Sequence, residues 1–187
     1  MSILDIRVLG DPVLRRPTTR VTEVNDELRA LIADMFETMY AAEGIGLAAP
    51  QVGRRERIAV VDVEGRKFAL INPDIVTAGT ASDKAEEGCL SIPDIYGDIE
   101  RPLEVTIRFI DETGKAREES GTALLGRCFQ HEIDHLDGKL FIDYLSPLKR
   151  RSALSKWEKA KHEYPGNVRK VRNEQPGAHN KETAEEM

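Results

Sequence analysis

The chain has 187 residues, of which 40% are hydrophobic and 32% charged, and its formal net charge is -6. This length fits one domain with a sizeable core, and the acidic balance argues against a general nucleic-acid-binding surface, so we expect no DNA partner. No apolar run approaches a membrane-spanning length and residues 1–7 lack the regions of a signal peptide, so we expect a cytoplasmic protein with no membrane partner. The two cysteines, Cys89 and Cys128, are too few for a disulfide scaffold.

The first predicted helix begins after Asn25, a residue type that commonly caps helix N-termini. Before it, residues 1–19 contain two prolines and are expected to be extended or turned. The helical pattern fades near Ala42, and Gly44 can end the helix. Apolar residues at helical spacing form its core face: Leu28, Leu31, Ile32, Met35, Phe36 and Met39.

Residues 44–53 read Gly-Ile-Gly-Leu-Ala-Ala-Pro-Gln-Val-Gly. Two glycines separated by one residue, Gly44 and Gly46, indicate a backbone that another group approaches closely. The segment follows a helix rather than a strand and lacks the third glycine of a dinucleotide-binding fingerprint, so it is weak evidence for a phosphate loop. An ordinary loop is the alternative.

The middle of the chain is predicted to consist of strands, because β-branched and apolar residues gather there between turn residues. Asn72 and Pro73 are expected to break one strand, and a short strand is expected at 139–144. The other predicted strands cover residues 57–63, 67–71, 75–80 and 105–110, followed by a turn at 111–115 into a further strand.

Residues 130–135 read Gln-His-Glu-Ile-Asp-His, and we expect them on a helix that begins near Thr122 and stops at Gly138. The spacing of His131 and His135 places both imidazoles on one helix face, where they can hold one divalent metal ion. Glu132 lies close enough to act as a base toward water at that metal. The sum is an α+β fold with mainly antiparallel strands around a central helix carrying the His-Glu-x-x-His motif.

Catalytic metal sites commonly use three protein ligands, and the sequence offers two candidates for the third. Glu158 would complete a zinc peptidase pattern. Cys89 is the better candidate, because a thiolate is a strong ligand and the neighbouring Gly88 lets the chain pass close to the metal. A buried hydrophobic role for Cys89 is the alternative reading.

Three motifs together resemble the bacterial-type peptide deformylase family. They are Gly-Ile-Gly-Leu-Ala-Ala-Pro-Gln at 44–51, Glu-Gly-Cys-Leu-Ser at 87–91 and Gln-His-Glu-Ile-Asp-His at 130–135, in the family's order and at similar spacing. Residues 9–15 and 138–141 are also similar to it. The resemblance implies a metal-dependent hydrolase that removes the N-formyl group from the N-terminal methionine of newly synthesised polypeptides and releases formate.

By this resemblance Cys89, His131 and His135 hold one metal ion per chain, with the fourth position open to water. Family members work with Fe²⁺ and accept Ni²⁺, Co²⁺ or Zn²⁺. Glu132 would take the proton of the water and deliver it to the leaving amine. A non-catalytic relative that only binds metal is a further alternative, but an intact Glu132 and Gln51 argue against it.

The resemblance also implies the groups that handle the substrate. The side-chain amide of Gln51 and the backbone N–H of Leu90 would stabilise the oxyanion. Arg101 would pair with Glu87 and brace the loop at Cys89. The residues implied in substrate binding are Gly44, Ile45, Gly46, Glu87, Gly88 and Cys128.

Two positions depart from the larger apolar residues common in the family's methionine pocket, Ala85 and Arg127. We expect the stem of Arg127 to lie along the pocket rim, against the methionine side chain, with its charged head in water.

Past the family resemblance, residues 149–176 contain nine Lys or Arg and three Glu, a net of +6 that leaves -12 for the rest. We predict a catalytic domain at 1–148, a basic C-terminal helix at 149–165 and a polar, flexible tail at 166–187. A basic helix around Trp157 could bind ribosomal RNA through phosphate contacts, which suits an enzyme of nascent chains. A solvated segment without a partner is the alternative.

Overall fold

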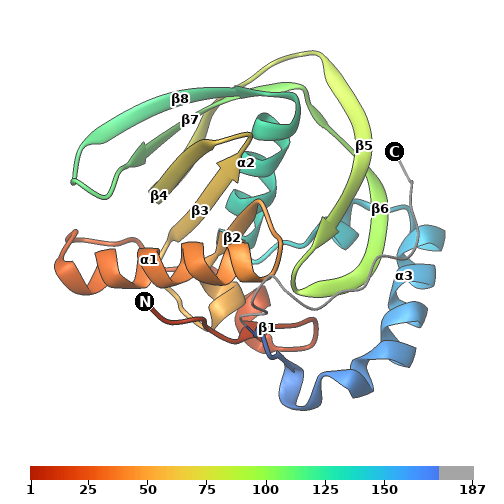
Figure 1. Ribbon diagram of the computed structural model, residues 1–187. Helices are drawn as coiled ribbons and strands as arrows, with labels where there is room; N and C mark the ends of the chain where they lie inside the picture. The colour runs from red at the N-terminus through yellow and green to blue at the C-terminus, as the bar shows by residue number, and fades with distance from the viewer. Residues whose placement is uncertain (173–187) are drawn as a thin grey trace, which may run out of the picture.

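The computed structural model describes residues 1–172, which form a five-stranded antiparallel sheet with a helix on each face and a long hairpin beside it (Figure 1). This architecture confirms the predicted α+β fold with mainly antiparallel strands around the motif-bearing helix. The strand order is β2–β3–β4–β7–β8, so β2 is an edge strand. The bounds are α1 Asp26–Ala41, α2 Ala123–Leu136, β2 Gly46–Ala48, β3 Ile58–Val63, β4 Arg66–Ala78, β7 Glu104–Ile110 and β8 Ala116–Thr122.

The sheet is covered on both faces, which explains why β3 is almost uniformly apolar. Val60 belongs to the hydrophobic cluster under α1, whereas Val61 belongs to the cluster under α2. Successive side chains of a strand point to opposite faces, so a strand covered on both sides needs apolar residues at consecutive positions. Helix α2 is therefore held firmly against the sheet, and this fixes the direction in which its histidines point.

Helix α1 begins and ends as the sequence predicts. The Asn25 side chain accepts a hydrogen bond from the Leu28 N–H at 2.9 Å, which caps the first turn. After Ala41 the Gly44 N–H bonds back to the Met39 carbonyl at 2.9 Å. The chain then enters β2 directly, so the glycine-rich segment is a strand and a 3₁₀ turn (Ala49–Val52) rather than an ordinary loop.

A two-stranded hairpin, β5 (Ser82–Cys89) and β6 (Ile92–Pro102), lies beside the sheet and carries Cys89 at the end of its first strand. The hydrophobic pattern does not reveal this hairpin, because most of β5 is polar and exposed. Its outer side is covered by α3 (Pro147–Ala160), whose Trp157 is only 4% exposed and joins the isoleucines of β6 in one cluster.

Two predicted elements are wrong. Asn72 and Pro73 do not end a strand: β4 continues past them with a register shift, and Asn72 takes a positive φ while its side chain bonds the Val21 backbone twice at 2.8 Å. The predicted strand at 139–144 is a 3₁₀ helix, Phe141–Tyr144. Its turn is closed by Asp143, whose carboxylate accepts from the Leu140 N–H at 3.0 Å.

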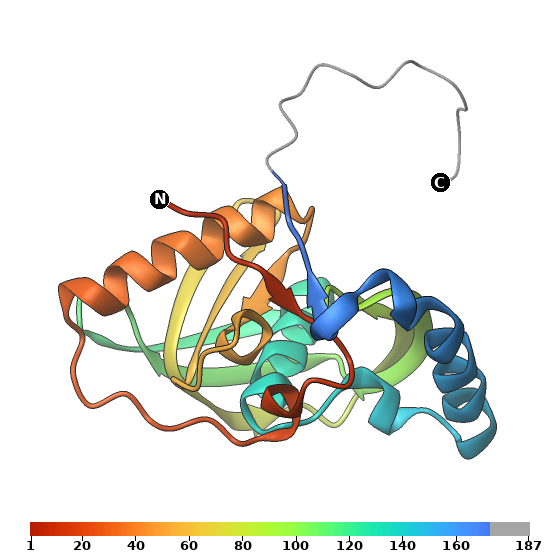
Figure 2. The same ribbon diagram turned by 90° about the horizontal axis from the view of Figure 1, so that it is seen from below.

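The C-terminal predictions need a correction. The basic helix is present but spans 147–160 rather than 149–165, and short 3₁₀ turns follow it. The predicted tail is wrong in its described part: Val168–Arg169 forms β9, which pairs antiparallel with β1 (Ile6–Arg7) near the other end of the chain (Figure 2). The rest of that prediction, 173–187, lies outside the described residues. Among the described helices, none is both long and apolar enough to cross a membrane.

Candidate functional site

The end of β5 meets the C-terminal half of α2, and there three potential metal ligands gather. Cys89, His131 and His135 each offer one ligand atom, and these atoms lie within 4.8 Å of one another. The Cys89 Sγ is 3.3 Å from the His135 Nε2. Tetrahedral bonding at the usual metal–sulfur and metal–nitrogen lengths places two such ligand atoms about 3.5 Å apart. The residues therefore fit a metal cofactor.

Each imidazole is prepared for this role by its surroundings. The His131 Nδ1 lies 2.9 Å from a carboxylate oxygen of Glu87, which leaves its Nε2 free for a metal. His135 is 1% exposed, and burial lowers its pKa well below the usual range, so this imidazole is neutral and able to ligate.

Glu87 is the centre of a largely buried ion-pair network. It accepts two hydrogen bonds from Arg101, at 2.6 and 2.9 Å, so the predicted pair is present. Burial raises the pKa of Glu87, but its hydrogen bonds to His131 and Arg101 outweigh burial and lower the pKa to about 2. Arg101 also donates to Asp134 at 2.9 Å. The Glu87 carboxylate is thus already bonded to both His131 and Arg101.

Arg127 does not lie with its head in water as predicted. It is 8% exposed, and its guanidinium turns inward to donate to Glu87 at 2.8 Å and to the carbonyls of Ile99 and Asp83 at 2.8 and 2.9 Å. The reason is electrostatic: the buried Glu87 carboxylate attracts the guanidinium away from solvent. Ala85 faces Ile99 across the hairpin and is not among the pocket-lining residues.

The environment of Glu132 is the opposite of that of Glu87. It is 4% exposed, and its Oε2 is buried without a hydrogen-bond partner among the described residues. Burial raises the pKa of Glu132 to about 7. Gly46 makes room for this carboxylate, because a Cβ added there would come within 2.8 Å of the Glu132 Cδ and 3.0 Å of the Cys128 Sγ. Other groups therefore do approach this glycine closely, as expected, and they are the side chains of Glu132 and Cys128.

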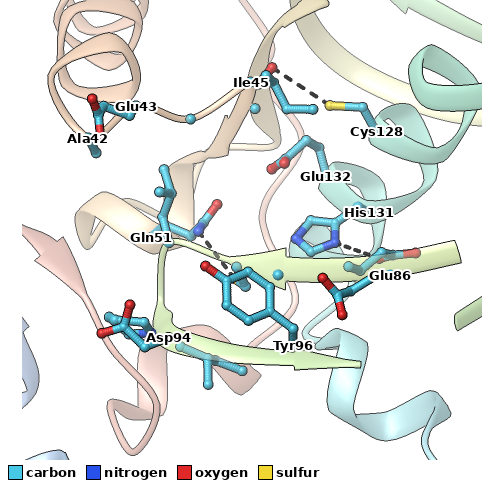
Figure 3. Close-up of a pocket in the computed structure, with 18 of the residues that line it drawn as sticks. Ala42, Glu43, Ile45, Gln51, Glu86, Asp94, Tyr96, Cys128, His131 and Glu132 are labelled. Carbon is cyan, nitrogen blue, oxygen red and sulfur yellow. Dashed lines mark hydrogen bonds and ion pairs between the residues drawn. The ribbon is translucent and has the colours of Figure 1, made fainter. Parts of the chain in front are cut away.

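Gln51 reaches the same space from the turn after β2. Its Oε1 accepts from the Ala48 N–H at 2.9 Å, which directs its Nε2 toward the Ser91 Oγ at 3.2 Å and the Cys89 Sγ at 3.7 Å. Figure 3 shows Gln51, Glu132 and His131 pointing from two elements into one space. An amide donor, a carboxylate acceptor and potential metal ligands thus lie close to one another.

Gln51, Glu132, Cys89 and His131 line a pocket of about 560 Å³. All residues expected to bind substrate line it: Gly44, Ile45, Gly46, Glu87, Gly88 and Cys128, together with Leu90. The Cys128 Sγ lies 3.7 Å from the Ile45 carbonyl, and Cys128 is not one of the three residues whose ligand atoms gather. Glu158 takes no part: it lies on α3, is largely exposed and pairs with Lys161 at 2.6 Å, so the zinc peptidase arrangement is not formed.

Comparison with known proteins identifies the family. Residues 3–151 match the family model described as polypeptide deformylase. A peptide deformylase of Alkalilimnicola ehrlichii is 50% identical over 163 residues, which cover 85% of this chain and 91% of that protein. The chain belongs to the peptide deformylase family.

Solved structures of peptide deformylases agree. The crystal structure from Legionella pneumophila matches with a TM-score of 0.82 and 44% identity, covering 86% of this chain and 96% of that one. The structure from Synechococcus elongatus, in complex with actinonin, matches with a TM-score of 0.80 and 45% identity, covering 83% and 88%. The family recognised from three motifs is thereby confirmed, and with it the enzyme class: a hydrolase that removes the N-formyl group from the N-terminal methionine of new polypeptides.

Two pocket residues of this deformylase could not be anticipated. Tyr164 and Arg169 line the pocket, although both follow residue 151, where the family match ends. Arg169 reaches the site because β9 returns to pair with β1. Such a long-range pairing leaves no local pattern in the sequence.

Proposed function

We propose that this deformylase holds one divalent metal ion through Cys89, His131 and His135, and that its own side chains then manage the proton and the oxyanion. The convergence of three ligand atoms within 4.8 Å, beside a buried carboxylate with an unpartnered oxygen, supports the proposal most strongly. The metal, when bound, acidifies water and polarises the formyl carbonyl. A Cys/His₂ set suits Fe²⁺, Ni²⁺, Co²⁺ or Zn²⁺, and we propose Fe²⁺ as the native ion.

Glu132 is the group that moves the proton. Its free oxygen accepts a proton from the attacking water, whose oxygen bonds to the formyl carbon. The same proton then passes to the amine nitrogen as the C–N bond breaks, so formate and a free N-terminus leave. The buried position keeps bulk water from competing for this proton.

Gln51 and Leu90 supply the donors for the charge that develops on the formyl oxygen. The Gln51 amide is fixed by the Ala48 N–H, so its Nε2 faces the site before substrate arrives. The Leu90 backbone N–H belongs to the turn directly after Cys89. Both donors are held by the fold, which lowers the reorganisation needed during reaction.

The substrate backbone pairs with the free side of β2 and with the Gly88 segment. Because β2 is an edge strand, one side of it remains available for an added strand. The methionine side chain then contacts Ile45, Cys128 and the ring of His131, which line the pocket.

The decisive experiment combines metal analysis with formate release from a formyl-methionyl peptide. Cys89→Ala should lose both the metal and the activity, whereas the matched control Cys128→Ala should keep its metal because that thiol only lines the wall. Ordinary peptides lacking the formyl group should not be cleaved. Equal metal content in Cys89→Ala and wild type would overturn the proposed site.

The choice of iron has its own test. Ferrous iron beside a thiolate is open to oxidation, and the thiolate can be oxidised as well. Enzyme purified without oxygen should contain iron and lose activity in air, while nickel- or cobalt-substituted enzyme should last longer. Equal lifetimes in air for all metal forms would argue against native iron.

We further propose a cytoplasmic enzyme that docks on the ribosome through α3. Its basic residues Arg151, Lys156 and Lys159 are exposed, while Trp157 anchors the other face of the helix. Arg151→Glu with Lys159→Glu should reduce co-sedimentation with ribosomes at low salt, whereas Lys115→Glu on the β7–β8 turn should not. Wild-type binding should weaken steeply with salt. Equal sedimentation of all forms would show that α3 is only a solvated helix and does not bind the ribosome.

A further inference from the structure

The turn that presents the Leu90 N–H has little support of its own. It joins β5 to β6, and the hairpin register shifts between Gly88 and Cys89, so Leu90 and Ser91 lie outside the regular ladder. Two bonds from other segments hold Ser91: the Leu9 N–H donates to its carbonyl at 2.9 Å, and Gln51 donates to its hydroxyl at 3.2 Å. A third bond, from farther along the chain, holds Leu90 itself.

This third bond comes from Arg169. Its Nη1 donates to the Leu90 carbonyl at 3.2 Å, and Arg169 is one of the residues that line the pocket. A bond from a charged donor to a carbonyl is stronger than one between neutral groups. The bond from Arg169 therefore restrains rotation at Leu90, in the part of the turn that the two bonds to Ser91 do not hold.

The position of Arg169 is itself well determined. Arg169 pairs with Ile6 in the β1–β9 ladder, and the Val8 N–H donates to the Asn167 carbonyl at 3.0 Å. On the approach to this strand, Tyr164 stacks on the buried Trp157 with ring centroids 5.6 Å apart. The returning segment is thus anchored at Arg169 itself and along the stretch that leads up to it.

We propose that Arg169 is a positioning residue of the deformylase reaction, which holds Leu90 so that its N–H meets the developing oxyanion. The C-terminal strand is then a working part of the active site, although it lies beyond the family match at 3–151. The inference rests on the role proposed above for the Leu90 N–H. Oxyanion donors act over a narrow range of distance, so a small movement of Leu90 weakens transition-state binding more than substrate binding.

The test is steady-state kinetics on full-length, metal-loaded enzyme with a formyl-methionyl peptide. Arg169→Met keeps the aliphatic stem and removes the donor, and we expect kcat to fall about tenfold while KM stays within about twofold. Arg169→Lys, which can still donate to the carbonyl, should recover most of the loss. Metal content should be unchanged in both variants, because the bond of Arg169 is to a backbone carbonyl and not to a proposed ligand side chain.

Lys170→Ala is the matched control. Lys170 is the next residue along the chain, is exposed and pairs with Asp5 at 2.5 Å, so its loss loosens the segment without touching Leu90. It should leave kcat unchanged. Melting temperatures of all variants separate loss of fold from loss of positioning.

Four outcomes would overturn the inference: wild-type kcat in Arg169→Met, a change confined to KM, no recovery in Arg169→Lys, or an equal loss in Lys170→Ala. A failure of the proposed metal site would appear elsewhere, as metal retained by Cys89→Ala. The two failures are therefore distinguishable.

Discussion

Two buried carboxylates face the same pocket, and their surroundings differ completely. Glu87 and Glu132 are 6% and 4% exposed. Glu87 has three charged or polar partners, His131, Arg101 and Arg127, whereas one oxygen of Glu132 has none among the described residues. Their pKa values lie far apart for this reason, at about 2 for Glu87, whose hydrogen bonds outweigh burial, and about 7 for Glu132, where burial dominates. Burial alone therefore does not determine the role of a carboxylate. From the difference in partners we propose that the paired Glu87 orients His131 and that the unpaired Glu132 exchanges a proton.

Glu132→Gln should separate the two roles most strongly. It keeps the shape of the side chain and removes its capacity as a base, so formate release should fall by about 10²- to 10⁴-fold. Metal content and melting temperature should stay at the wild-type level, because no ion pair is lost. Near-normal turnover in a metal-loaded Glu132→Gln enzyme would show that another group moves the proton.

Glu87→Gln should show the reverse pattern. Two buried guanidinium groups, of Arg101 and Arg127, would lose a counter-charge, and we expect the free energy of unfolding to fall by about 3 kcal/mol. Metal affinity should drop about 10- to 100-fold as His131 loses its orienting acceptor. Denaturant titration and metal competition measure the two effects.

Glu86→Gln is the control for this change, because Glu86 is the neighbouring residue on β5 and is exposed. Its effect on unfolding should stay within about 0.5 kcal/mol. A stable, metal-binding Glu87→Gln would mean that the network contributes nothing to the site.

The same contrast shows what the sequence can and cannot predict. The spacing of His131 and His135 is local, so periodicity alone places them on one face, and the clearance at Gly46 follows from the absence of a side chain. The partners of Glu87 depend on residues from a different strand and helix. The inward turn of Arg127 could not be foreseen without knowing that a buried carboxylate lies beneath it. Arg169 depends on strand pairing across almost the whole chain, which no short pattern encodes.

Gly46→Ala tests Glu132, the unpaired carboxylate, by displacing its side chain rather than by changing its chemistry. The new Cβ would come within 2.8 Å of the Glu132 Cδ and displace the carboxylate. We expect kcat to fall about tenfold with the metal still bound, since a misplaced base transfers protons poorly. Gly79→Ala is the control, because its Cβ would meet only ordinary contacts from 3.5 Å. Unchanged kcat in Gly46→Ala would show that Glu132 can act from a shifted position.

Arg127→Leu tests whether Glu87 needs Arg127 in addition to its other two partners. Of the substitutions discussed, we expect this one to have the smallest effect. Glu87 would keep Arg101 and His131, so the metal should remain bound and kcat should change little. The cost should come from the Ile99 and Asp83 carbonyls that lose a donor, about 1 kcal/mol in the free energy of unfolding. An apolar residue in the pocket wall should also lower KM for formyl-methionyl peptides relative to peptides with a polar first residue. Chemical denaturation and a comparison of the two KM values check both parts. Loss of the metal in Arg127→Leu would show instead that Arg101 alone cannot hold Glu87 against His131, and that Arg127 is essential to the paired side of the site.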